Sequence, residues 1–101
     1  EYEAVLADIN RFTKQQRVVL TYLTQRESLV IDEKALAYNT GYSLPAMRIK
    51  PLVDAGWIKR TLNSNHTLYL YQSNVRSRFK TMFQDLDMDD LMKPILKLER
   101  V

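Results

Sequence analysis

The sequence contains no cysteine among its 101 residues. Disulfide bridges, thiolate nucleophiles, cysteine-ligated zinc and cysteine redox sensing are therefore excluded. The same absence favours a cytoplasmic protein. Glycine and proline are scarce as well, with two and three residues, which argues against long disordered segments. No apolar run approaches the roughly 18 residues that a membrane-spanning helix needs, so we expect no contact with a membrane.

Groups that carry catalysis or bind metals are also missing. His66 is the single histidine, and without cysteines or clustered carboxylates it cannot form a zinc site. The acidic run at residues 85–90 superficially resembles a calcium loop, but Asp90 and Leu96 stand where the loop needs glycine and glutamate. No nucleophile stands beside a base, and no glycine-rich phosphate loop occurs. We predict that the protein is not an enzyme and has no metal and no cofactor.

Length and charge indicate one small basic domain. The chain is 46% hydrophobic and carries a net charge of +3, enough for one buried core. A mild positive balance is compatible with nucleic acid binding but does not establish it. The distribution of charge is more informative, because basic side chains gather between residues 48 and 60 while the acidic ones concentrate in residues 85–90.

Hydrophobic residues recur at helical spacing near both ends of the chain. A first stripe predicts a helix over residues 1–12, and two more follow residue 74. The first stripe consists of Tyr2, Val5, Leu6, Ile9 and Phe12, and the later ones include Phe79, Phe83, Leu91, Ile95 and Leu98. A short three-helix module buries only part of such surfaces, so these flanking helices indicate extra packing or a subunit interface.

Capping residues between positions 13 and 56 predict three helices. Thr13 and Gln16 have the spacing of a capping box before a helix over residues 14–26. A β-prone stretch at residues 28–31 follows, and Asp32 caps a helix over residues 33–39 that Gly41 ends. Ser43 is placed to cap a third helix. Pro51 predicts that this helix is kinked or short.

Two strands, residues 57–62 and 66–71, are expected next, joined by a turn at residues 63–65. The alternation of side chains places Ile58 on the same side as Leu68 and Leu70, with Tyr69 and Tyr71 on other faces. The tip residues would suit a tight turn as well as they would suit hydrogen bonds to a sugar or phosphate. We leave these two interpretations open.

This order of elements resembles the MarR-type winged helix-turn-helix transcription regulators. The resemblance covers most of the chain and is strongest in LTYL (20–23), ALAYNTGYS (35–43) and IKPLVDAGWIKR (49–60). It implies a mainly α-helical fold with a small β-hairpin, forming one domain over residues 1–101. In that domain a winged helix-turn-helix core (14–72) is flanked by dimerisation helices (1–12 and 74–101). The function implied is a homodimeric regulator that binds double-stranded DNA.

The resemblance also assigns residues to two surfaces. The DNA-binding residues would be Ser43, Ala46, Met47, Arg48, Lys50, Lys59, Arg60, Asn63, Asn65 and His66. The dimerisation residues would be Tyr2, Val5, Ile9, Phe79, Phe83, Leu91, Ile95 and Leu98. Related regulators bind small-molecule effectors, but no residue here identifies such a pocket.

Other interpretations stay open at this point. Arg48 and Lys50 could belong to an ordinary solvated helix face, although the surrounding module favours DNA contact. The chain could be a winged-helix protein-interaction or adaptor module whose flanking helices dock a different protein. It could also be a plasmid-partition or replication DNA-binding protein, which would use the same face for another purpose.

Overall fold

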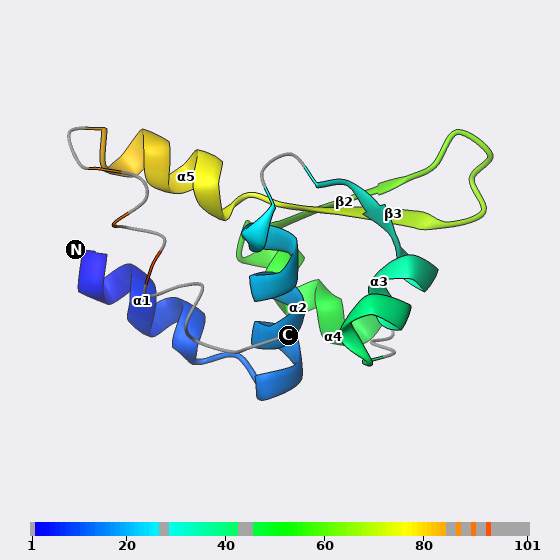
Figure 1. The fold of residues 1–101 in the computed structure, drawn as a ribbon, viewed down its shortest axis with the longest axis horizontal. Coiled ribbons are helices and arrows are strands. Elements are labelled where there is room, and N and C mark those ends of the chain that lie inside the picture. Colours follow the sequence, from blue (N-terminus) through cyan, green and yellow to red (C-terminus); the bar gives the residue numbers. More distant parts are fainter. Residues whose placement is uncertain are drawn as a thin grey trace.

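The computed structural model describes residues 2–26, 29–42, 46–84, 87, 90 and 93, with the backbone alone at 46 and 47. This part of the chain contains five helices and three short strands (Figure 1). In chain order they are α1 (Tyr2–Asn10), α2 (Lys14–Gln25), β1 (Ile31–Asp32), α3 (Glu33–Thr40), α4 (Ala46–Asp54), β2 (Ile58–Leu62), β3 (Tyr69–Ser73) and α5 (Val75–Met82). The protein is therefore mainly helical with a small antiparallel sheet.

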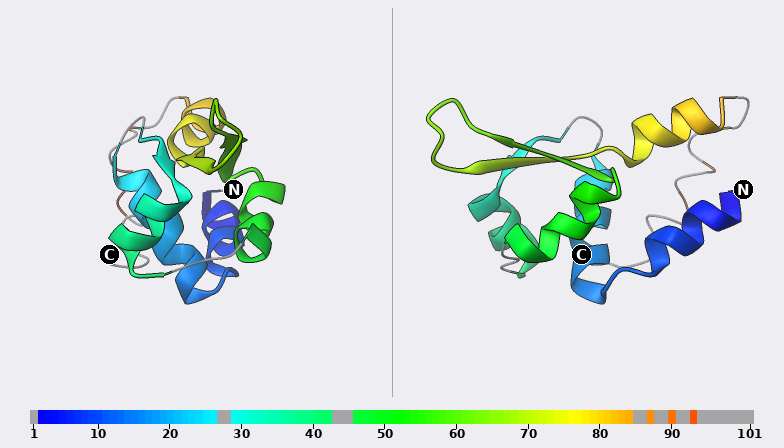
Figure 2. Two further views of the ribbon diagram at one scale, coloured as in Figure 1. Left: turned by 90° about the vertical axis from the view of Figure 1, so that its right-hand side faces the viewer. Right: turned by 180° about the vertical axis from the view of Figure 1, so that it is seen from behind.

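The sheet and α2 form the centre of the molecule. The strands pair antiparallel in the order β1-β3-β2, and α2 packs against β3, α3 and α4. The helices α1 and α5 lie together at one end, while the β2–β3 hairpin projects at the opposite end (Figures 1 and 2). Figure 1 also places α3 and α4 on the hairpin's side of α2, and α4 contacts β2.

The helix signals predicted from the sequence are confirmed where the structure describes them. The Thr13 hydroxyl accepts a hydrogen bond from the Gln16 N–H (3.2 Å), and the Gln16 side chain accepts one from the Thr13 N–H (2.9 Å). Asp32 accepts from the Ala35 N–H (2.8 Å) at the start of α3. Gly41, with φ of +76°, ends that helix because glycine adopts the left-handed conformation without steric cost. Ser43, the expected cap of the next helix, lies outside the described residues.

The helix α4 is short, as Pro51 predicted, and it continues through the proline to Asp54. Proline inside a helix removes one N–H donor and costs about 3 kcal/mol. Burial offsets this cost, since Ile49 is 2% exposed and Leu52 is fully buried. Gly56, with φ of +83°, then turns the chain into β2.

The predicted register of the hairpin was wrong. A turn confined to residues 63–65 would place Ile58 opposite Leu70, whereas Ile58 lies opposite Ser73 and Leu70 lies opposite Thr61. The difference of three residues is odd, and an odd shift exchanges the two faces of a strand. Tyr71, which is 1% exposed, therefore faces the core with Ile58.

The core draws on nearly every element. Its largest fully buried side chains include Trp57, Tyr71 and Phe79. The cluster of buried side chains consists of Ile9, Phe12, Val19, Leu20, Leu23, Leu36, Ile49, Leu52, Trp57, Ile58, Tyr71, Val75 and Phe79. Both α1 and α5 thus contribute to the core of their own chain.

Candidate nucleic-acid interface

Two exposed cationic side chains flank the buried Ile49 of α4. Arg48 and Lys50 are exposed, whereas Ile49 between them is buried. Lys50 Nζ lies 2.6 Å from Asp54 Oδ2, one helical turn later. Arg48 Nη1 makes a long contact of 3.5 Å with Gln15 Oε1 of α2. Exposed pairs of this kind contribute little to stability, so either cation can change partner at small cost.

Three further residues assigned to DNA binding precede Arg48 and Lys50 in the sequence. Ala46 and Met47 lie in the first turn of α4, but the structure describes only their backbone. Ser43 lies entirely outside the described residues. Their contacts with DNA therefore stay predictions.

The backbone of α4 is tied to α2 by Gln16. Its side-chain Nε2 donates to the Arg48 carbonyl at 2.7 Å, and the residue is only 8% exposed. From the sequence, Gln16 was recognised only as part of a helix cap. The second bond joins residues 32 positions apart, so no local pattern could have revealed it.

Lys59 and Arg60 point to opposite sides of the sheet, because successive side chains of a strand alternate. Lys59 is exposed, while Arg60 lies opposite Tyr71 on the core-facing side. The Arg60 guanidinium carbon sits 4.9 Å from the centre of the Tyr69 ring. The two cations therefore lie on different faces at the base of the hairpin, with Lys59 exposed and Arg60 packed on Tyr69.

The hairpin loop, residues 63–68, is organised by Asn63. Its Oδ1 accepts from the Thr67 N–H (3.0 Å), and its Nδ2 donates to Thr67 Oγ1 (3.3 Å). Its backbone carbonyl accepts from the His66 N–H and its N–H donates to the Leu68 carbonyl, both at 2.9 Å. Asn63 therefore serves the turn, whereas the exposed side chains of Asn65 and His66 remain available to a ligand.

Two other arginines serve the fold. Arg76 Nε donates to the Thr24 carbonyl in the last turn of α2, and Arg78 Nη1 donates to the Ala55 carbonyl just after α4, both at 2.9 Å. The carboxyl end of a helix carries partial negative charge that favours a cation. These two charges fix α5 to α2 and α4, so the net charge overstates what is available to nucleic acid.

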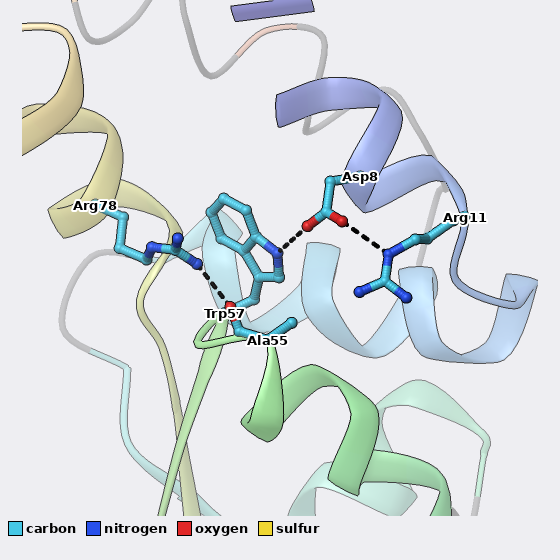
Figure 3. Close-up of polar contacts among 5 residues, drawn as sticks. All are labelled: Asp8, Arg11, Ala55, Trp57 and Arg78. Carbon is cyan, nitrogen blue, oxygen red and sulfur yellow. Dashed lines mark hydrogen bonds and ion pairs between the residues drawn. The ribbon is translucent and has the colours of Figure 1, made fainter. Parts of the chain in front are cut away.

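Trp57 connects α1, the start of β2 and α5 (Figure 3). Its Nε1 donates to Asp8 Oδ2 at 3.1 Å, and Arg11 Nε donates to Asp8 Oδ1 at 2.8 Å. The Arg78 guanidinium carbon lies 3.9 Å from the centre of the indole. The hydrogen bonds from Arg11 and Trp57 lower the pKa of Asp8 below its ordinary value because both stabilise the charged carboxylate.

Several residues assigned to dimerisation are buried in, or packed against, the core of their own chain. Ile9 and Phe79 are 1% and 0% exposed, so neither is on the surface. Tyr2, Phe79 and Phe83 form a cluster of edge-to-face rings with centroids 5.6 to 5.9 Å apart. Tyr2, Val5 and Phe83 keep some exposed surface. The last three assigned residues, Leu91, Ile95 and Leu98, lie outside the described residues.

The described residues offer little to other kinds of ligand. No group of three or more histidine, aspartate or glutamate side chains among them is placed to hold a metal ion. None of their helices has the length and apolar character needed to cross a membrane. A hollow that is partly open to solvent is lined by Glu33, Leu36, Tyr42 and their neighbours, and its volume of about 10 Å³ is room for about one water molecule.

No family model, no curated protein and no solved structure matches this chain. The function must therefore be inferred from the chain's own geometry. Its most distinctive surface combines the exposed Arg48 and Lys50 of α4 with the projecting hairpin that carries Lys59.

Proposed function

We propose that this chain binds double-stranded DNA as a winged helix-turn-helix regulator of the MarR type, with α4 as the recognition helix and the β2–β3 hairpin as the wing. The observation that carries the proposal is the run α2–β1–α3–α4–β2–β3 with strand order β1-β3-β2. In this arrangement a short helix with two exposed cations contacts the base of a projecting hairpin. The major groove admits one α-helix, and a neighbouring hairpin can then reach the flanking backbone or minor groove.

The chemistry of the exposed side chains supports this assignment. Arg48 offers a fork of donors that suits a phosphate or a guanine edge, and Lys50 and Lys59 offer point charges. Lys50 would exchange the Asp54 carboxylate for a phosphate. Asn65 and His66 at the hairpin tip would donate to sugar or phosphate oxygens. Contacts of this kind make affinity depend steeply on salt, because each neutralised phosphate releases counterions.

We propose further that two copies bind together. The few cations available in one chain provide few phosphate contacts, and a dimer doubles them. Closed twofold dimers are the commonest assemblies, and the margin of α1 and α5 offers the half-buried Tyr2 and Phe83 beside Met82, which is 41% exposed. Selection of bound duplexes from a random pool would test this, since a dimer should select two symmetric half-sites about one helical turn apart.

A duplex-binding titration across salt concentrations tests the DNA surface. The double variant Arg48→Ala/Lys50→Ala should bind more weakly and lower the log–log salt slope by about 1.8, or about 0.9 for each lost phosphate contact. The control Lys80→Ala/Lys93→Ala removes two charges that are also exposed but lie on or beyond α5. Asp54→Asn should strengthen binding, because it frees Lys50. Equal losses in the two double variants would contradict the assignment of α4.

A protein-interaction module is the second candidate. It is favoured by apolar side chains that the described surface leaves uncovered, above all Tyr38 (87% exposed), Val30 (53%) and Leu62 (46%). They come from α3, the segment before β1 and the hairpin, and single exposed apolar residues are common in monomeric proteins. The same titration separates the candidates, because an adaptor would bind little duplex even at low ionic strength.

A further inference from the structure

One amide group makes two hydrogen bonds of different kinds at the junction of α2 and α4. Gln16 Oε1 accepts from the Thr13 N–H inside the cap of α2, at 2.9 Å. Gln16 Nε2 donates to the Arg48 carbonyl of α4, at 2.7 Å. Glutamine and glutamate serve equally in a capping box, but an ionised carboxylate has no donor. The cap could be made by either glutamine or glutamate, whereas the bond to the Arg48 carbonyl needs the amide N–H of glutamine.

The helix α4 has particular need of this bond. It is nine residues long and contains Pro51, and a helix of that length is not stable on its own. Ile49 and Leu52 hold it against the core, but apolar contacts are not directional. The bond from Gln16 is directional and ends on the Arg48 carbonyl, next to the carbonyl of residue 47, which Pro51 cannot serve as an N–H donor. It ends on the backbone of Arg48, the residue whose exposed side chain is assigned to DNA.

We propose that Gln16 is a positioning residue for DNA binding: it touches no nucleic acid but fixes the orientation of α4 and hence the direction in which Arg48 points. The inference rests on the proposed function, because the orientation of α4 matters for binding only if α4 contacts DNA. A residue needed only for the cap would stabilise the whole protein without a separate effect on α4.

Two substitutions separate the roles. Gln16→Glu keeps the acceptor of the cap and sets a carboxylate oxygen against the Arg48 carbonyl. Thr13→Ala removes the hydroxyl that caps α2 and leaves the bond to Arg48 intact. Amide hydrogen exchange would be measured across α2 and α4. Gln16→Glu should speed exchange in α4 by about fivefold or more, as expected for the loss of one hydrogen bond, and Thr13→Ala should speed it only in the first turn of α2.

Affinity is then measured for a random-sequence duplex of about two helical turns at low salt. Gln16→Glu should weaken binding by about fivefold or more, and Thr13→Ala should leave binding unchanged wherever the protein is folded. Gln16→Met controls for the added negative charge, since it removes the amide donor without adding a charge, and Thr13→Ala reports any effect of the cap. If Gln16→Met binds as well as the wild type while Gln16→Glu binds weakly, charge is the cause and the proposal is overturned.

Protonation provides a rescue. Below the pKa of the introduced carboxyl group, near pH 4, its O–H can donate to the Arg48 carbonyl. The NMR shifts of α4 in Gln16→Glu should then move toward those of the wild type at the same pH, whereas Gln16→Met should show no such return. If the wild type binds duplex and Gln16→Glu binds equally well, the positioning role falls and the DNA function stands. If the wild type binds no duplex, the DNA function and the proposed use of Gln16 both fall, and altered exchange in α4 would then show only a structural bond.

Discussion

Replacing Phe79 with leucine tests the aromatic cluster that joins α1, α5 and the start of β2. Phe79 is fully buried, and its ring makes edge-to-face contacts with Phe83 (5.6 Å), Tyr2 (5.9 Å) and Trp57 (6.1 Å). Each such pair contributes about 0.5–1.5 kcal/mol beyond the burial of its area. Leucine retains much of the buried volume but none of these contacts. We expect the free energy of unfolding to fall by about 2–3 kcal/mol, since three contacts sharing one ring do not add fully.

Trp57 makes the assay direct. It is the only tryptophan, it is 2% exposed, and it lies in this cluster, so its fluorescence reports urea unfolding of the region in question. The expected loss should also lower the melting temperature by roughly 10 °C or more. Phe83→Leu is the matched control, because Phe83 is only half-buried. A loss below about 1 kcal/mol for Phe79→Leu, or an equal loss for Phe83→Leu, would refute the reasoning.

Two further predictions concern Asp8 and the glycines. The lowered pKa of Asp8 means that its stabilising contribution is present above the ordinary carboxyl pKa and is lost as pH falls through the lowered value. In urea unfolding, the gap between wild type and Asp8→Asn should therefore close below about pH 4, and a gap constant with pH would argue against the assignment. Gly41 and Gly56 both have positive φ, but only a Cβ at Gly56 would crowd Arg78, 3.2 Å from its Nη1. Thermal unfolding should show that Gly56→Ala costs about 1 kcal/mol more than Gly41→Ala, because it also disturbs the hydrogen bond from Arg78 to the Ala55 carbonyl; equal costs would contradict this.

Local chemistry predicted local structure well. The caps at Thr13 and Asp32 and the helix stop at Gly41 involve residues within four positions of one another, so the sequence displays them directly. The hairpin register was not predictable in this way. The length of its loop depends on how the Asn63 side chain bonds to Thr67, and a shift by an odd number of residues was enough to exchange the two faces of the strand.

The candidate surface was predictable only in part. The sequence correctly predicted that Ile49 and Leu52 face the core, and Arg48 and Lys50, on either side of Ile49, are exposed. It could not show that Arg76 and Arg78 are used by the fold, since their partners are carbonyls 52 and 23 positions away. Bonds from side chains to a distant backbone leave no periodic pattern. They appear only once the helices are packed.

The strand order β1-β3-β2 leaves β2 at an edge of the sheet that the structure describes. An unpaired edge invites strands of other molecules, and a lysine on such an edge discourages that association. Lys59 is exposed on β2, so a substitution such as Lys59→Ala would remove both the proposed phosphate contact and a charge that opposes aggregation. Lys59→Glu keeps the edge charged while it repels phosphate. In any binding experiment on this hairpin, charge reversal would therefore be more informative than neutralisation, because it separates lost affinity from lost solubility.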